Sequence, residues 1–169
     1  MTERHSENDV QIVHFPGVRV AVLEHRGDAC RVGDSVRKFI EWRRKTGLVP
    51  RTSATFNVSA CDPEATAPDA YQLDLCAATD AEIVDHGYGI IEKHIPAGRC
   101  AKLRHVGSED LLRDSIHFLY FDWLPKSGNE PRDYPLFMQR LTLFPDVPEH
   151  EQIVDIYLPL LDRPVGADA

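Results

Sequence analysis

RVAVLEHRGD at residues 19–28 and RCAKLRHVGS at residues 99–108 share Arg, Ala, Leu, His and Gly at the same places. The two stretches begin 80 residues apart, and further matches continue on both sides of them. These matches pair His14 with His94, Pro16 with Pro96, Asp34 with Asp114 and Ser35 with Ser115; after one inserted residue, they pair Trp42 with Trp123, Gly47 with Gly128, Pro50 with Pro131, Arg51 with Arg132 and Asp74 with Asp155. Self-similarity at a fixed period indicates a duplicated unit. We therefore expect a single domain over residues 1–169, with one repeat at about 10–79 and another at about 88–161.

Each half is predicted to form a strand, a helix and two further strands. A Val-rich run at 10–27 predicts an opening strand that is bent or paired around its Pro-Gly break. Apolar residues at three-to-four spacing predict amphipathic helices over 28–47 and from 108 to about 123, the second ended by Pro125 and Gly128. Further strands are expected at 52–59, 70–79, 135–144 and 153–161. The predicted fold class is α+β: a tandem duplication of a β-α-β-β unit with pseudo-twofold symmetry, whose antiparallel sheet and two main helices flank a ligand groove.

Charge and cysteine usage limit the partners and the compartment. A formal net charge of −8 and a pI near 5.4 oppose direct nucleic-acid binding, which draws its affinity from Lys and Arg on the phosphates. The cysteines show no C-x-x-C spacing, and the N-terminus has no apolar run of a signal peptide, so we expect a cytoplasmic protein. No stretch approaches the roughly 20 apolar residues of a membrane span, so no membrane contact is expected.

The sequence predicts no catalytic residues, no cofactor and no metal. None of the eight histidines falls in an H-E-x-x-H spacing, and no serine lies in a G-x-S-x-G turn. Gly87 and Gly89 are not followed by a helix or by Lys-Ser/Thr, which favours a turn over a phosphate loop. His25 and His105 end equivalent strands, and we expect structural hydrogen bonds from both. His105, near the start of the second helix, is also a candidate ligand contact.

Aromatic residues recur on the predicted helices and central strands. A packed core explains any one of them, but their repeated placement favours a groove lined by flat rings and a few acids. Such a groove suits a small hydrophobic, planar or cationic ligand, because ring faces stack on flat molecules and attract cations. The candidate lining residues are Trp42, Phe56, Tyr120, Trp123, Phe137 and Tyr157, and the nearest acids are Glu24, Asp74 and Asp155.

Several motifs, taken in order, resemble those of a known family. They are NVSACDPEATAPDAYQLDL (57–75), KHIPAGRCAKLRHVGS (93–108), FDWLPKSG (121–128) and DIYLPL (155–160). Together with the double β-α-β-β arrangement, they resemble the GyrI-like small-molecule-binding domain, over about residues 10–161. This family includes the DNA gyrase inhibitory protein and the effector-binding domains of AraC-type and MerR-type regulators. The resemblance implies two fused repeats that enclose a groove for bulky, hydrophobic or cationic compounds.

One position departs from what the resemblance implies. Family members that hold cationic drugs commonly have an F-E-x-Y pattern after the second helix, where this chain has Phe137, Met138, Gln139 and Arg140. Met138 therefore stands at the position of the acid and Arg140 at that of the tyrosine. A cation would lack the carboxylate that offsets its desolvation. An inward-facing Arg140 would instead favour an anionic or carbonyl-bearing ligand.

Three functions remain open from the sequence. Fewer than ten residues precede the first strand, so we expect a freestanding effector-binding domain without a helix-turn-helix. A hydrolase of reactive natural products, as among some relatives, would need Glu24 or another carboxylate to replace the missing acid. A protein-binding role would set the acidic surface against a basic face of gyrase or of a regulator.

Overall fold

The computed structural model describes residues 5–59, 70–143 and 146–162, and its chain divides into two compact units. Unit 1 consists of Met1–Pro16, Ala97–Leu136 and Leu141–Ala169, and unit 2 of Gly17–Pro96 and Phe137–Arg140. Residues 60–69 of the motif at 57–75, including Cys61, lie outside the described residues. None of the helices in the described ranges is long and apolar enough to cross a membrane.

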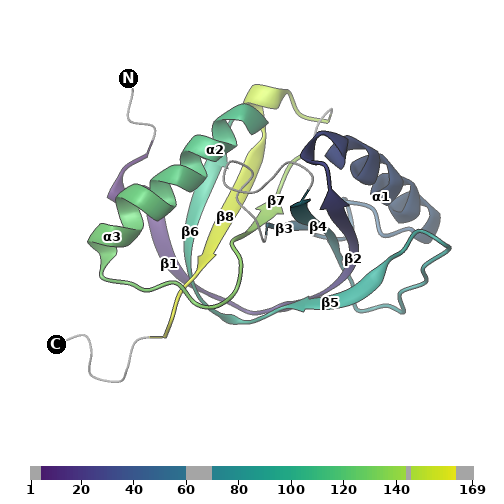
Figure 1. Ribbon diagram of the computed structural model, residues 1–169, viewed down its shortest axis with the longest axis horizontal. Coiled ribbons are helices and arrows are strands. Elements are labelled where there is room, and N and C mark those ends of the chain that lie inside the picture. The colour runs from purple at the N-terminus through teal and green to yellow at the C-terminus, as the bar shows by residue number, and fades with distance from the viewer. Residues whose placement is uncertain (1–4, 60–69, 144–145, 163–169) are drawn as a thin grey trace. The chain divides into compact units, whose positions relative to one another are not determined.

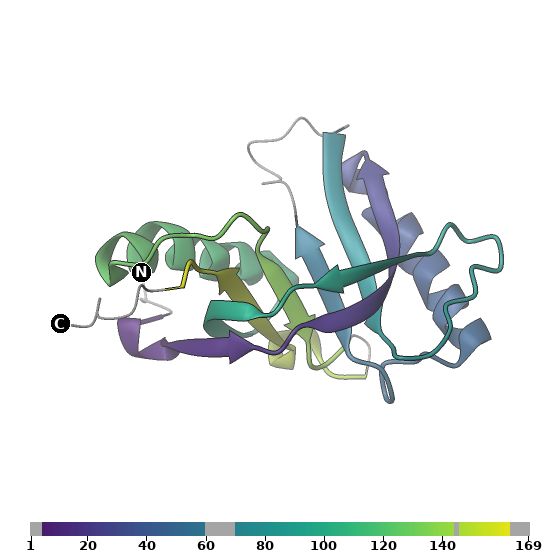
Figure 2. The same ribbon diagram turned by 90° about the horizontal axis from the view of Figure 1, so that it is seen from below.

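Unit 2 is an antiparallel sheet with one α-helix. Its strand order is β7-β3-β4-β2-β5, and α1 lies against the sheet (Figures 1 and 2). The strands are β2 (Val18–Gly27), β3 (Thr55–Ser59), β4 (Tyr71–Ala78), β5 (Ile91–Ile95) and β7 (Phe137–Arg140), and the helix is α1 (Val32–Thr46). The Asp28 side chain accepts a hydrogen bond from the Cys30 backbone N–H in the 3-10 turn before α1, and Gly47, at φ 78°, ends the helix as predicted.

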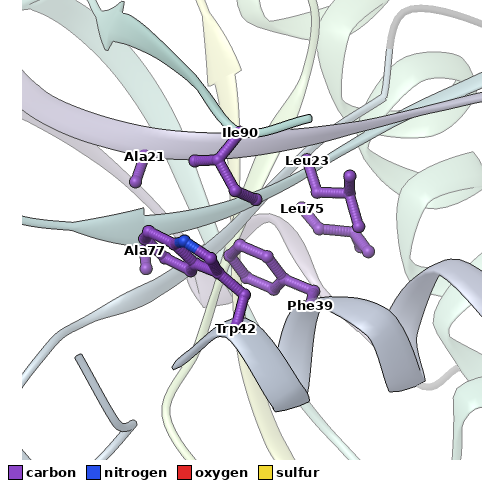
Figure 3. Close-up of a cluster of buried hydrophobic side chains, with 7 residues drawn as sticks. All are labelled: Ala21, Leu23, Phe39, Trp42, Leu75, Ala77 and Ile90. Carbon is purple, nitrogen blue, oxygen red and sulfur yellow. The ribbon is translucent and has the colours of Figure 1, made fainter. Parts of the chain in front are cut away.

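The core of unit 2 lies between α1 and the sheet. Phe39 and Trp42 of α1 stack with their ring centroids 5.8 Å apart above small and aliphatic residues of the strands (Figure 3). The Trp42 indole N–H donates a 2.8 Å hydrogen bond to the Val84 carbonyl, so the ring is buried without an unsatisfied donor. The strand residues beneath the two rings are Ala21, Leu23, Leu75 and Ala77, with Ile90 beside them.

Unit 1 is a three-stranded antiparallel sheet under a longer helical segment. Its strand order is β1-β6-β8, and the helical segment runs over it (Figure 1). The elements are β1 (Val10–Phe15), β6 (Gly98–Val106), α2 (Glu109–His117), a π-helical stretch (Phe118–Trp123), α3 (Leu124–Ser127) and β8 (Ile153–Pro159). Pro125 does not end this segment as predicted; it lies in α3, directly after the π-helical stretch. The segment ends at Gly128, at φ 73°.

The π-helical stretch lies where the spacing between matched residues of the two halves increases by one. Ser115 matches Ser35 at a spacing of 80, whereas Trp123 matches Trp42 at a spacing of 81. The π-helical stretch Phe118–Trp123 lies between Ser115 and Gly128, and a π-turn accommodates one residue more than an α-turn. The extra residue is therefore absorbed within the helix, and Trp123 is still buried.

The units do not coincide with the repeats, although the α+β class and the antiparallel pairing are confirmed. β1, from the first predicted repeat, pairs with β6, while β5, from the second predicted repeat, pairs with β2. The run at 10–27 therefore breaks at Gly17, at φ 79°, into two strands with different partners. Of the two predicted forms, a bent strand and a paired hairpin, the hairpin is wrong. The first strand of each predicted repeat thus pairs with a strand of the other predicted repeat.

Candidate ligand-binding residues

The ladder register tells which strand residues of unit 2 face α1. Residues directly opposite each other in an antiparallel pair project from the same face of the sheet. Leu75 and Ala77 pack beneath α1, so their ladder partners Asn57 and Thr55 also face it. The register continues into β7, where Met138 lies opposite Asn57 and Arg140 opposite Thr55. The α1-facing side of the β3–β7 pair is therefore built from Thr55, Asn57, Met138 and Arg140.

Arg43 of α1 reaches the same strand and carries a buried charge. Its side chain is 3% exposed and donates three hydrogen bonds to neutral oxygens. These run to the Leu48 carbonyl (2.5 Å), the Thr55 hydroxyl (2.7 Å) and the Ser53 carbonyl (2.9 Å). No carboxylate in the described part of the chain pairs with it, and burial lowers the pKa of Arg43 to about 10.

Arg140 is the second cation on this side of β3. It is half-buried, and its Nε donates a 2.5 Å hydrogen bond to the Asn57 side-chain oxygen. Asn57 is itself buried, and this contact orients the guanidinium. Met138, two residues earlier, is 6% exposed and contributes an apolar surface beside it. Two guanidinium groups thus contact positions 55 and 57 of one strand, from one face.

The opposite face of the unit 2 sheet carries other predicted lining residues. Phe56 and Phe137 lie on this face, with ring centroids 6.5 Å apart, and both are buried. Glu24 and Asp74, directly paired across β2 and β4, project from it as well. Both acids are held by the same two cations: Arg26, at 2.6 Å from Glu24 and 2.9 Å from Asp74, and Lys93, at 2.8 Å from each. The hydrogen bond from Lys93 lowers the pKa of Glu24.

The corresponding face of unit 1 has a similar pattern. Tyr157 is buried there against Phe15, with ring centroids 5.3 Å apart, and this burial raises the pKa of the phenol. Asp155, on the same face, accepts from Arg104 Nε at 2.8 Å and from an Arg104 terminal nitrogen at 3.1 Å. Lys102 lies 3.4 Å from the same carboxylate. These charges are already paired, so Asp155 holds strands β6 and β8 together.

His25 and His105 form the structural hydrogen bonds expected of them. His25 Nδ1 lies 2.8 Å from the Ser35 hydroxyl, and His105 Nδ1 lies 2.7 Å from that of Ser115. The other ring nitrogen contacts a backbone carbonyl in each case, at 2.9 Å and 3.0 Å. A carbonyl only accepts, so Nε2 donates, and in the neutral ring Nδ1 then accepts from the serine. Each histidine ties the end of a strand to the helix that follows it.

The remaining predicted residues lie in the helices. Trp42 and Trp123 are buried, Trp42 completely, whereas Tyr120 in the π-helical stretch is half-buried and its pKa is raised by burial. The structure therefore separates the predicted residues by unit and by face. Of the predicted lining residues on the strands, Met138 and Arg140 are the two that lie beside the polar groups of Thr55 and Asn57 on the α1-facing side of the unit 2 sheet. The described residues contain no cluster of His, Cys, Asp or Glu suited to a metal ion.

Arg43, Thr55 and Asn57 were not singled out from the sequence. A usable signal was present, because TFNVS at 55–59 alternates polar and apolar residues in a strand that is almost wholly buried. Polar side chains at every second position of a buried strand must find partners on one face. In the sequence, Arg43 belongs to a run of three cations in the last turn of the helix, a position where cations are favoured; its neighbours Arg44 and Lys45 are exposed there.

Comparison with known proteins gives a match over almost the whole chain. The family model of the GyrI-like small molecule binding domain matches residues 8–161, and so spans both units. A protein of Escherichia coli (strain K12) described as probable transcriptional regulator YgiV is 39% identical over 153 residues, which cover 90% of this chain and 96% of that protein.

Solved structures share the fold at low sequence identity. The C-terminal domain of EcmrR superposes with a TM-score of 0.69 at 16% identity, covering 91% of this chain and 98% of that one. SAV2435, solved with bound tetraphenylphosphonium, superposes with a TM-score of 0.55 at 8% identity, covering 90% and 93%. At these identities the likeness concerns the fold alone.

Proposed function

Because the chain belongs to the GyrI-like small-molecule-binding domain family, we propose that it is an effector-binding protein that takes up a small planar or apolar compound in a regulatory or protective role. The family match over residues 8–161 is the observation that carries the proposal. The relative named as a probable transcriptional regulator, at 39% identity, supports the regulatory part. The free thiols of Cys30, Cys76 and Cys100 fit a reducing cytoplasm.

The α1-facing side of the β3–β7 pair is the best candidate for the ligand contact in unit 2. It combines an apolar side chain, Met138, with the hydrogen-bonding groups of Asn57 and Arg140. Ligand sites are mostly apolar with a few well-placed polar groups, and this side of β7 offers that mixture. The acids on the opposite face are less suited, because Lys93 and Arg26 already occupy both Glu24 and Asp74.

A thermal-shift screen tests the proposal. The panel contains aromatic compounds of matched size that are cationic, neutral and anionic, with tetraphenylphosphonium among the cations. A ligand present at about 100 times its Kd stabilises a protein by about 2.7 kcal/mol, which raises the Tm of a chain of this size by about 5–10 °C. We expect such a shift with at least one aromatic class and none with a sugar control. A panel in which no aromatic compound raises the Tm would overturn the proposal.

A further inference from the structure

We infer that the outer face of α1, formed by Val36, Arg37, Ile40 and Arg44, is a docking surface for the helical segment at 109–127 of a second copy of this chain. The two surfaces lie outside the candidate ligand contact, so the inference does not depend on the proposed function. It is carried by the opposite charges of the two helical segments and by the apolar side chains that both leave exposed.

The first observation is the charge of α1. Its 15 residues include five cations and two acids, in a chain with a net charge of −8. Asp34 accepts hydrogen bonds from both Arg31 and Arg37, so two guanidinium groups share one carboxylate. Arg44 is exposed, and no carboxylate of the described residues lies within ion-pair distance of it. α1 therefore presents surplus positive charge to the solvent.

The helical segment of unit 1 has the opposite charge. Residues 109–127 include four acids and two cations. Asp110, Asp114 and Asp122 are exposed, and none of them forms an ion pair within the part of the chain that the structure describes. Asp110 and Asp114 are four residues apart in α2, so their carboxylates lie on one side of the helix. The helices of the two units therefore carry complementary charges.

The outer face of α1 also exposes apolar side chains between its cations. Val36, Ile40 and Arg44 follow one another at four-residue spacing and form one row along the helix. Arg37 is three residues before Ile40, so Arg37 and Arg44 flank this side chain. Ile40 is 41% exposed although it lies in the middle of the helix. A partner that covers this face therefore gains apolar contact as well as ion pairs.

The acidic segment of unit 1 offers the matching surface. Leu111 is exposed and lies three residues before Asp114 in α2. Phe121 is 66% exposed, and its ring packs on that of His117 with the centroids 4.6 Å apart. Packing the side-chain row of one helix into the groove of another removes such apolar groups from water. The same packing sets the cations of α1 near Asp110 and Asp114.

A second copy fits this face better than a nucleic acid or an acidic membrane surface. Phosphate binding needs cations alone and gives no role to Val36 and Ile40. Helices that bind membrane surfaces use Trp, Phe and Leu, whereas Phe39 and Trp42 of α1 are buried in unit 2. At physiological salt the Debye length is about 8 Å, so local ion pairs outweigh repulsion between the net charges of two copies.

Sedimentation velocity of the whole chain tests the inference. One helix-on-helix contact is small beside the roughly 1,200–2,000 Å² of a stable interface, so we expect reversible association with a Kd of about 10–100 μM. Dimers and larger oligomers both support the inference, because each copy carries both surfaces. A chain that stays monomeric at about 500 μM, well above the expected Kd, would overturn it.

Charge reversal assigns the contact to the two helices. Arg37→Glu/Arg44→Glu makes α1 acidic, and Asp110→Lys/Asp114→Lys makes α2 basic. Each variant alone should associate at least about tenfold more weakly than wild type, because each reversal replaces an attraction with a repulsion. An equimolar mixture should recover association, since the acidic α1 of one variant meets the basic α2 of the other. A mixture that does not associate would refute the inference.

Matched controls separate the helix faces from net charge. Glu130→Lys/Asp133→Lys changes the net charge as much as the α2 variant but replaces exposed acids outside the helices of unit 1, so it should associate as wild type does. Ile40→Ser should weaken association, whereas Val84→Ser, at an exposed apolar residue outside α1, should not. Circular dichroism and Tm establish that each variant is folded. A control reversal as damaging as the α2 reversal would contradict the inference.

Other occupants of the outer face of α1 give a different result. A monomeric chain that binds poly-L-glutamate or a DNA duplex through Arg37 and Arg44 would assign the face to another acidic partner and refute the second copy. The ligand screen on wild type tests the proposed function separately, and its outcome leaves the self-association measurement unchanged.

Discussion

In unit 2, Asp74 lies opposite Glu24 across the β2–β4 ladder, whereas in unit 1 the matching Asp155 lies opposite Arg104 across the β6–β8 ladder. Like charges directly opposite each other destabilise a sheet, so unit 2 needs Arg26 and Lys93 to bridge its two acids. Unit 1 needs no such bridge, because Arg104 binds Asp155 with two nitrogens. The matched strands thus carry a four-residue network in unit 2, where Glu24 and Arg26 stand, and an Arg104–Asp155 pair with Lys102 beside it in unit 1, where Arg104 and Val106 take their places.

Unlike these charged contacts, the histidine contacts are the same in the two units. His25 with Ser35 and His105 with Ser115 make the same two kinds of hydrogen bond in the two units. Residues that the matched stretches share therefore join each strand to its helix, while residues that differ set the local charge. Substituting matched residues in the two units tests whether shared residues contribute equally to the stability of both units and differing residues do not.

The largest effect is expected from the matched tryptophans. Trp42→Ala should lower the free energy of unfolding by about 3–5 kcal/mol, because it removes a fully buried ring. It also leaves the Val84 carbonyl without its donor. Trp123→Ala should cost less, since that ring is 8% exposed. Urea denaturation followed by circular dichroism measures both, and a larger loss for Trp123→Ala would contradict this ranking.

The histidine contacts should give the next largest effect. His105→Phe keeps a buried ring but leaves the Ser115 hydroxyl and the Ser108 carbonyl without this partner, at about 1–3 kcal/mol for each buried group. His25→Phe should cost a similar amount, because the same bonds are lost in unit 2. Urea midpoints of the two variants and of Ser35→Ala and Ser115→Ala provide the measurement. A costly change in one unit with a neutral change in the other would show that the two contacts are not equivalent.

Asp155→Asn should have a smaller effect. The amide keeps the shape of the side chain and one acceptor for Arg104, so the loss is the difference between charged and neutral hydrogen bonds, about 1–2 kcal/mol. The matched change Asp74→Asn should cost less, because it also relieves the repulsion from Glu24. Thermal melts at low and at high salt would reveal the ranking. An Asp74→Asn variant less stable than Asp155→Asn would refute it.

Glu24→Gln should have the smallest effect and the clearest pH dependence. The pKa of Glu24 is lowered, mainly by the hydrogen bond from Lys93, so the folded state binds its proton less readily than the unfolded state. The contribution is therefore present at neutral pH and is lost as the pH falls through the lowered pKa. The side chain is 36% exposed, which limits the effect to about 1 kcal/mol or less. Urea titrations from neutral to acidic pH should bring wild type and variant together, and a difference that grows toward acid would have the wrong sign.

The sequence predicts elements better than their partners. Val-rich runs, helical spacing and the glycines after Thr46 and Ser127 predict where most strands and helices occur, because these signals are local. Which strand pairs with which depends on contacts between distant segments, so the pairing of β1 with β6 and of β5 with β2 was not predicted. Pro125 was misjudged because its neighbours alone do not reveal that a new helical turn begins there.

The candidate site was predicted only in part. Met138 and Arg140 were found from a departure within a short motif, and the register places both on the α1-facing side. From the sequence, Phe56 and Glu24 were grouped with them, because residue type alone does not tell which face of a strand a side chain occupies. A shift of one position in a strand changes the face. That Arg43 and Asn57 lie on the same side follows only from the ladder register and from the burial of both residues, which the sequence does not give.

The pairing of β1 with β6 and of β5 with β2 has a consequence for folding during synthesis. Unit 1 needs β1, at residues 10–15, and β8, which ends at residue 159, so its sheet cannot be completed until residue 159 has left the ribosome. Unit 2 likewise waits for β7, at residues 137–140. The nascent chain therefore exposes the edges of β2 and β3 for much of translation, and high contact order of this kind slows folding. We therefore expect neither residues 10–79 nor residues 88–161 to fold alone, because each segment lacks strand partners that the other supplies.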